Sequence, residues 1–357
     1  MIPLLLPAKA EGSTRFVTRL IGSAFEHTNT EDSILIAESG GRMVFSGQHG
    51  LIEIISVHDL DGDVVCVDPI RGSAERLIRA TSPHNTLLIT ERCDQLCVMC
   101  SQPPKKTHSD RFAEYSQAIL LSPNGKTIGL SGGEPTLYKS ELFALIEGIF
   151  AKRPDISFHI LSNGQHFSAD DIPRLRGPAF ENVTWGIPLY SHEMGRHDEI
   201  VAKAGAYARL MESFVHLLTA GAKVELRTVL LQSNTVDLPE LARLICTHLS
   251  FCVQWSIMQL ENIGFAKRRF SKLYVDHHKS FDRIAEALDT SELRGLEARL
   301  FNFPRCTVPT EYRHYAVSSI SDWKRKFAPA CNSCTQQAMC AGFFEWHPDS
   351  ALEVYPL

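Results

Sequence analysis

The sequence predicts an α/β protein in which a partial barrel of six β/α units lies between a small β-rich N-terminal domain and a cysteine-rich C-terminal extension. Three observations predict this class. Apolar strand-like runs alternate with helix-like stretches from residue 84 onward, short β-type runs precede them, and the last part of the chain combines cysteines with little apolar periodicity. The 357 residues, 44% of them hydrophobic, are enough to build a large core.

The N-terminal domain is expected over residues 1–82. The segments "SILIAESG", "GLIEIISV" and "DGDVVCVDP" are short runs of β-type residues separated by glycine and aspartate turns. The glycines of "SGGRMVFSGQHG" form neither a dinucleotide-binding fingerprint nor a P-loop, so we expect no nucleotide site in this domain.

The barrel is expected over residues 83–299. Its strands are predicted at 85–90, 126–133, 156–164, 182–190, 223–231 and 252–260, and its helices at 110–121, 138–152, 168–176, 198–220, 237–249 and 276–289. Alternating strands and helices predict a parallel sheet with right-handed crossovers. Six units are too few for an eight-stranded TIM barrel, so we expect a partial, TIM-like barrel with its ligand site at the carboxyl ends of the strands.

Three cysteines follow the first predicted strand directly, in "ERCDQLCVMCSQPPKK". Cys93, Cys97 and Cys100 have the spacing C-x3-C-x2-C, and clustered thiols in a protein without a secretory signal usually bind metal. Three thiolates can hold a [4Fe–4S] cluster while one iron keeps an open position for a small molecule. A zinc knuckle or a purely structural cluster is the alternative interpretation.

This motif, followed by "LSGGEPTLY" at the end of the second strand, resembles the radical S-adenosylmethionine (radical SAM) enzymes. The resemblance implies that the protein cleaves S-adenosylmethionine reductively at a [4Fe–4S] cluster to make a 5′-deoxyadenosyl radical. It implies that "GGEP" binds the methionine amino group, that "LSNG" lies near the ribose, and that Met99 replaces the usual aromatic neighbour of the adenine. The cofactor-binding residues expected from it are Met99, Gly132, Gly133, Glu134, Pro135, Ser162, Asn163 and Arg227.

The C-terminal extension, residues 300–357, carries a second cysteine group. "PACNSCTQQAMCAGFF" has the spacing C-x2-C-x5-C, and it resembles the extensions of peptide-modifying radical SAM enzymes, which carry an auxiliary [4Fe–4S] cluster. The expected ligands are Cys306, Cys331, Cys334 and Cys340. A structural zinc site is the alternative, since four thiols also close a tetrahedral zinc site.

Catalytic residues are not assigned from the sequence, but Tyr190 and Glu261 are candidates for contact with substrate because they lie at predicted strand ends. Asp198 is a third candidate, because the pair His197–Asp198 resembles His-Asp pairs at this place in peptide-modifying radical SAM enzymes. "SHEMGRHDE" is no zinc-protease motif, since Arg196 stands where the second histidine would be needed. Asp198 can instead cap the helix predicted over 198–220.

The stretches around both cysteine groups resemble one subfamily, the radical SAM maturase (C component) of the His-Xaa-Ser peptide-modification system, over about residues 35–350. The resemblance implies a ribosomally made substrate with His-x-Ser repeats, a second radical SAM maturase and a small partner protein, with flavodoxin or ferredoxin as electron donor. The alternatives are a radical SAM enzyme acting on a small molecule or RNA, and a non-enzymatic iron–sulfur or zinc protein.

Composition limits the remaining classes. The net charge of −5 gives no basic surface for nucleic acid, so we expect no nucleic-acid partner. No segment has the roughly 20 apolar residues of a membrane helix, and "MIPLLLPAKA" is too short and too rich in proline for a signal peptide. We therefore expect a cytoplasmic protein without a membrane partner.

Overall fold

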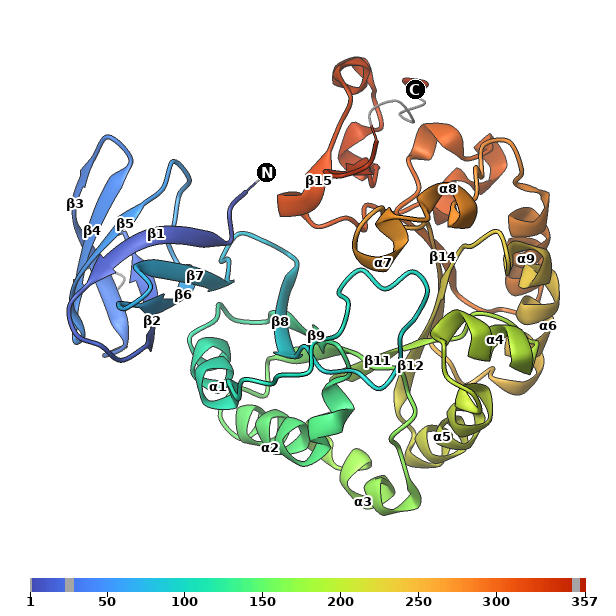
Figure 1. Ribbon diagram of the computed structural model, residues 1–357, viewed down its shortest axis with the longest axis horizontal. Helices are drawn as coiled ribbons and strands as arrows, with labels where there is room; N and C mark the ends of the chain where they lie inside the picture. Colours follow the sequence, from blue (N-terminus) through green and yellow to red (C-terminus); the bar gives the residue numbers. More distant parts are fainter. Residues whose placement is uncertain (1, 23–28, 349–353) are drawn as a thin grey trace.

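The computed structural model describes residues 2–22, 29–348 and 354–357. The chain forms three parts (Figure 1): a small β-barrel at the N-terminus, a curved parallel sheet with helices along its outer side, and a C-terminal extension that lies near α7 (Gly264–Lys267) and α8 (Phe270–Leu273).

The N-terminal part is a closed barrel of seven strands in the order β1-β5-β4-β3-β2-β6-β7. Its strands are β1 (Leu5–Ala10), β2 (Phe16–Ile21), β3 (Asp32–Ser39), β4 (Arg42–Gly47), β5 (Gly50–Ile55), β6 (Val64–Asp68) and β7 (Ser73–Ile78). Leu20, Ile52 and Ile54 are fully buried inside it. The sequence predicted a β-rich domain from three strands. It did not predict that the sheet closes into a barrel, because closure depends on the pairing of β1 with β7.

The central sheet has seven parallel strands in the order β14-β13-β12-β11-β10-β9-β8. They are β8 (Asn85–Thr90), β9 (Thr127–Gly132), β10 (Ser157–Leu161), β11 (Val183–Pro188), β12 (Lys223–Val229), β13 (Gln254–Met258) and β14 (Ala298–Phe301). The six predicted strands and their β/α units are found, but the sheet has a seventh strand that the sequence analysis did not predict. β14 was missed because "ARLF" is short and half polar, and it crosses the boundary predicted after residue 299.

Helices cover the outer face of the sheet (Figure 1). They are α1 (Phe112–Leu120), α2 (Lys139–Phe150), α3 (Ile172–Leu175), α4 (Met194–Val201), α5 (Ala206–Ala220), α6 (Leu238–His248) and α9 (Asp282–Leu293). Large apolar side chains from both layers, including Phe143, Trp185 and Trp255, are buried between them. Because alternate residues of a strand point to opposite faces, the side chains that are not buried under the helices lie on the concave face of the sheet.

The helix predicted over 198–220 is two helices. The chain leaves α4 through Ala202, whose φ is 54°, and enters α5 after Gly205, whose φ is 71°. Asp198 therefore lies inside α4, and its carboxylate accepts hydrogen bonds from the backbone N–H groups of Gly205 (2.6 Å) and Tyr207 (2.8 Å). Asp198 therefore caps a helix as expected, but it caps the start of α5 from its own position within α4.

The C-terminal extension consists of 3-10 turns and a two-stranded antiparallel sheet, β15 (Arg325–Lys326) and β16 (Phe343–Phe344). The guanidinium of Arg79, which follows β7, donates to both carboxylate oxygens of Asp322 at 2.7 and 2.8 Å, so this bidentate pair ties the two ends of the fold together. Over the residues that the structure describes, no helix combines the length and the apolarity needed to cross a membrane.

Candidate active site

The first cysteine group lies in the loop that follows β8, at the carboxyl edge of the parallel sheet. The backbone N–H of Cys100 donates to the carbonyl of Cys97 at 3.0 Å, and the thiols of Cys93, Cys97 and Cys100 interact electrostatically with one another. Burial, with a smaller contribution from the neighbouring thiols, raises the pKa of Cys97 to about 12. The structure thus places the three predicted ligands in one loop, close enough for their thiols to interact.

Backbone hydrogen bonds from three other parts of the fold hold this loop. Val98 N donates to Ile200 O at 2.8 Å, and Glu134 N donates to Arg92 O at 2.8 Å. On the far side of the loop, Phe265 N donates to Cys100 O at 2.9 Å. The neighbouring Gly264 has a φ of +59°, and a Cβ there would lie 2.2 Å from the same carbonyl, so only glycine allows this approach.

Asp94, between the first two cysteines, is a loop anchor that the sequence analysis missed. Its carboxylate accepts a hydrogen bond from Asn163 Nδ2 at 2.7 Å, lies 3.2 Å from His166 Nε2 and pairs with Lys203. Burial acts to raise the pKa of Asp94, but hydrogen bonds from His166 and Lys203 hold it well below its usual range. The sequence signal that could have indicated this role is a charged residue inside a cysteine motif.

Gly132 and Gly133 are required by the packing of the cysteine loop, while their expected contact with a cofactor stays a prediction. A Cβ on Gly132 would lie 2.0 Å from Thr90 O, and one on Gly133 would lie 2.1 Å from Arg92 O. Gly133 N also donates to Thr90 O at 2.7 Å. The two glycines therefore let the end of β9 pack directly on the chain that leads into the cysteines.

Glu134 is fully buried, and both of its carboxylate oxygens accept hydrogen bonds from the chain's own donors. One oxygen accepts from the backbone and hydroxyl of Thr136 (2.9 and 2.5 Å) and from Ser162 Oγ (2.8 Å). The other accepts from the backbone N–H of Asn163 at 2.5 Å, which leaves it able to accept one more hydrogen bond. Glu134 therefore joins the ends of β9 and β10, and its expected contact with the methionine amino group stays a prediction; Pro135 is buried in the turn that follows.

The remaining expected cofactor residues lie near the same edge. Met99 and Tyr190 are buried in one apolar cluster that also includes Cys97. Tyr190 interacts electrostatically with the three cysteines and with Arg227, and burial is the largest cause that raises its pKa. Arg227 itself donates from Nη1 to both oxygens of Glu225 at 2.9 and 3.0 Å. Tyr190 is the substrate candidate that the structure places beside the cysteine loop.

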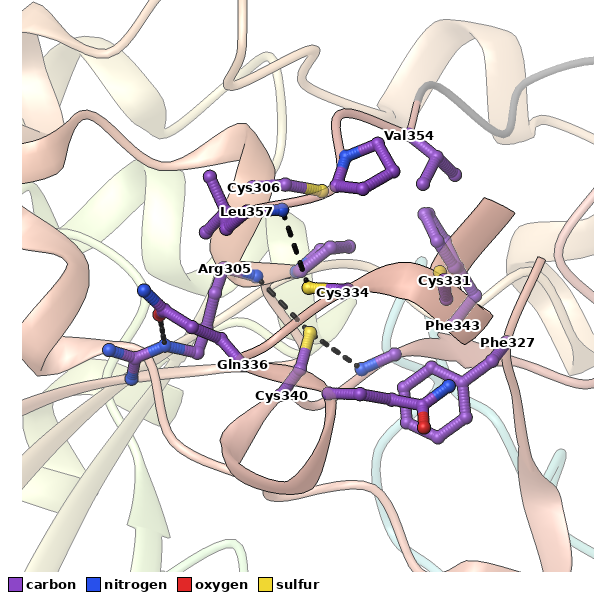
Figure 2. A pocket seen from close by; sticks show the side chains of 14 residues that line it. Arg305, Cys306, Phe327, Cys331, Cys334, Gln336, Cys340, Phe343, Val354 and Leu357 are labelled. Atoms are coloured by element: carbon purple, nitrogen blue, oxygen red, sulfur yellow. Dashed lines mark hydrogen bonds between the residues drawn. The ribbon is translucent and has the colours of Figure 1, made fainter. Parts of the chain in front are cut away.

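The second cysteine group lines one cavity (Figure 2). The cavity walls include Cys306, Cys331, Cys334 and Cys340. Backbone N–H groups surround the sulfur atoms: those of Arg305 and Gly342 donate to Cys340 Sγ at 3.3 and 3.4 Å, and that of Leu357 donates to Cys334 Sγ at 3.5 Å. Such donors stabilise thiolates, so the chemistry of this donor set fits an iron–sulfur cluster.

Glu261 lies between the sheet and the extension, away from the cysteine loop. Its carboxylate is 3.7 Å from Lys324 Nζ, and burial raises its pKa. Substrate contact by Glu261 and by Asp198 stays a prediction. In the described part of the chain, no three or more His, Cys, Asp or Glu side chains are positioned to hold a metal ion as they stand, so both ligand sets stay predictions.

Residues 87–245, from β8 to α6, match the sequence model of the family described as the radical SAM superfamily. This segment is therefore similar in sequence to radical SAM domains. The match covers the first cysteine motif, the Gly-Gly-Glu turn and Arg227, which the structure gathers at one edge of the sheet. No curated protein matches the chain.

The fold is similar to that of SuiB from Streptococcus suis. The structure of SuiB bound to S-adenosylmethionine has a TM-score of 0.51 at 15% identity and covers 62% of this chain and 51% of its own. The structure of SuiB bound to the precursor peptide SuiA has a TM-score of 0.51 at 14% identity and covers 64% and 50%. The present chain spans about half of the length of these structures, and the likeness concerns the fold alone.

Proposed function

We propose that the protein is a radical SAM enzyme that modifies a ribosomally made peptide. The observation that carries the proposal is the loop of Cys93, Cys97 and Cys100, held at the carboxyl edge of a radical SAM domain beside the Gly-Gly-Glu turn. With a [4Fe–4S] cluster and S-adenosylmethionine bound, such a site supplies a 5′-deoxyadenosyl radical that abstracts a hydrogen atom from substrate.

The residues of the chain have separate tasks in this proposal. The three thiolates hold the cluster, and Asp94 and Gly264 fix the loop that presents them. Glu134 holds the ends of β9 and β10 in register, so that Ser162 and Asn163 face the cofactor side. Met99 and Tyr190 provide an apolar wall next to Cys97, which excludes water from the radical.

The four cysteines of the extension are proposed to hold an auxiliary [4Fe–4S] cluster. The shared cavity and the N–H groups directed at Cys334 and Cys340 support this proposal over free thiols. The structural likeness to SuiB, which was solved with a precursor peptide, supports a peptide substrate.

The sequence resemblance to the His-Xaa-Ser maturases suggests repeats of that tripeptide in the substrate. On this basis we propose a cytoplasmic enzyme that works beside a second radical SAM maturase and a small partner protein, with flavodoxin or ferredoxin as electron donor. A synthetic peptide with His-Xaa-Ser repeats should then change mass in the complete reaction, whereas the same peptide with alanine at each histidine should not. An unmodified His-Xaa-Ser peptide in an assay that does cleave S-adenosylmethionine would refute this substrate.

The central test is anaerobic reconstitution with iron and sulfide, followed by dithionite and S-adenosylmethionine. We expect about eight irons per chain, for two four-iron clusters, and 5′-deoxyadenosine detected by mass spectrometry. Alanine at Cys93, Cys97 and Cys100 should abolish the product, and alanine at the isolated Cys246 is the matched control. Product formation by the triple variant would refute the site.

A further inference from the structure

The concave face of the sheet carries a group of polar side chains around Glu225 that the proposed function does not use. Glu225 and Arg227 share one face of β12, because alternate residues of a strand point the same way. Leu226 points to the other face and is buried in the core under the helices. A carboxylate only 6% exposed in the middle of a strand needs a reason, since burial of a charge is costly without partners.

Donors from three strands surround the Glu225 carboxylate. Besides Arg227 Nη1, Ser256 Oγ of β13 donates to Oε1 at 2.5 Å, and His159 Nε2 of β10 lies 2.5 Å from Oε2. Burial acts to raise the pKa of Glu225, but Arg227 and His159 lower it to about 2. The carboxylate is therefore ionised at neutral pH, and His159 donates from Nε2 because an ionised carboxylate only accepts.

A glycine in the intervening strand makes this arrangement possible. β10 and β12 are not neighbours, because β11 lies between them, and Gly186 of β11 is in register with Glu225. A Cβ on Gly186 would lie 3.1 Å from His159 Nε2 and 3.0 Å from Arg227 Cδ. Without a side chain at this position, His159 and Glu225 can meet across the strand.

Arg227 is held by one end only. Within the described residues, the hydrogen bonds of the Arg227 guanidinium to protein acceptors come from Nη1 alone. The side chain is 18% exposed, its guanidinium lies 5.8 Å from the ring centre of Phe301, and it interacts with Tyr190 beside the cysteine loop. A guanidinium fixed at one nitrogen with its remaining N–H groups open matches the planar, two-point geometry of a carboxylate.

We infer that Glu225 is a positioning residue that fixes the Arg227 guanidinium to bind the carboxylate of S-adenosylmethionine. The inference rests on the proposed function, and it names the part of the cofactor that this face of the sheet recognises. Loss of the negative charge of Glu225 makes the surroundings of Arg227 more positive, so electrostatic attraction alone would tighten the binding of a carboxylate. If Glu225 orients the guanidinium, its loss weakens that binding instead.

The test is equilibrium binding of S-adenosylmethionine to the reconstituted protein. We expect E225Q to raise the Kd about tenfold, and E225D to recover part of the affinity. The matched control is Glu240→Gln on α6, which removes one of the two carboxylate partners of Arg243 on the outer surface and should leave the Kd unchanged. Decarboxylated S-adenosylmethionine is the second probe, and its Kd should be nearly the same in wild type and E225Q, because it lacks the group that Arg227 holds.

The outcomes separate the inference from the proposed function. An unchanged or lower Kd for S-adenosylmethionine in E225Q would overturn the inference alone. Equal weakening for both ligands would also overturn it, since it would indicate general damage to the site. The second variant, G186A, moves His159 and Arg227 without removing a charge and should also weaken binding of S-adenosylmethionine selectively. Failure of the wild-type protein to bind S-adenosylmethionine would overturn the proposed function and the inference together.

Discussion

Replacement of Gly264 by alanine tests whether the packing of the loop after β13 holds the first cysteine group. Two costs add at this position. The φ of +59° is unfavourable for alanine by about 1–2 kcal/mol. In addition, the new Cβ would lie 2.2 Å from Cys100 O and 2.7 Å from Ser101 O, and relief of such an overlap costs about 1–3 kcal/mol. We expect the free energy of unfolding to fall by about 2–5 kcal/mol.

Gly295→Ala is the matched control, because Gly295 has a φ of +72° but a Cβ there would meet nothing within 4 Å. Gly295→Ala should lose only the stability that the unfavourable φ costs. Urea denaturation of both apo variants measures stability, and the iron content after reconstitution reports on the loop. We expect G264A to lose more stability than G295A and, unlike G295A, to take up less iron, because the displaced backbone carries Cys100. Full iron content in G264A, with no greater loss of stability than in G295A, would refute the reasoning.

Three further predictions follow from the same geometry. Cys334→Ala should lower iron by about four atoms per chain while 5′-deoxyadenosine is still made; unchanged iron, as expected for the control Cys246→Ala, would contradict an auxiliary cluster. Asp94→Asn should cost about 1–3 kcal/mol of unfolding free energy at pH 7, because Lys203 loses its partner. The pKa of Asp94 is lowered by folding, so this difference should narrow as the pH falls below about 4, and a constant difference would refute the ion pair. Burial lowers the pKa of His197 to about 4, so unfolding takes up a proton between that value and about 6.5. The free energy of unfolding of the apo-protein should therefore fall by up to about 3 kcal/mol as the pH is lowered from about 6.5 to about 4, and by less in H197Q. An identical pH dependence in the two proteins would exclude His197 as the group responsible.

The sequence predicted the repetitive parts of the fold well, because each depends on local pattern. Apolar runs between turn residues indicated six strands of the parallel sheet, and thiol spacing indicated both cysteine groups. β14 escaped because its stability comes from pairing with β13 and not from its own four residues. The single helix expected over 198–220 was broken by a left-handed turn that periodicity alone does not reveal.

Residue types at the site were predicted, but their tasks were decided by tertiary packing. "SGGEP" marks the turn after β9, and the structure shows that its glycines admit the backbone of Thr90 and Arg92 and that Glu134 accepts a hydrogen bond from the chain that follows β10. These contacts join residues far apart in the chain, so no local pattern specifies them. The sequence by itself determined that three thiols lie after the first strand of a parallel sheet, because spacing and strand order are local properties. Only the tertiary structure decided that Asp94 and Gly264 support these thiols and that Glu225 holds Arg227, because such contacts exist only where separate strands and loops meet.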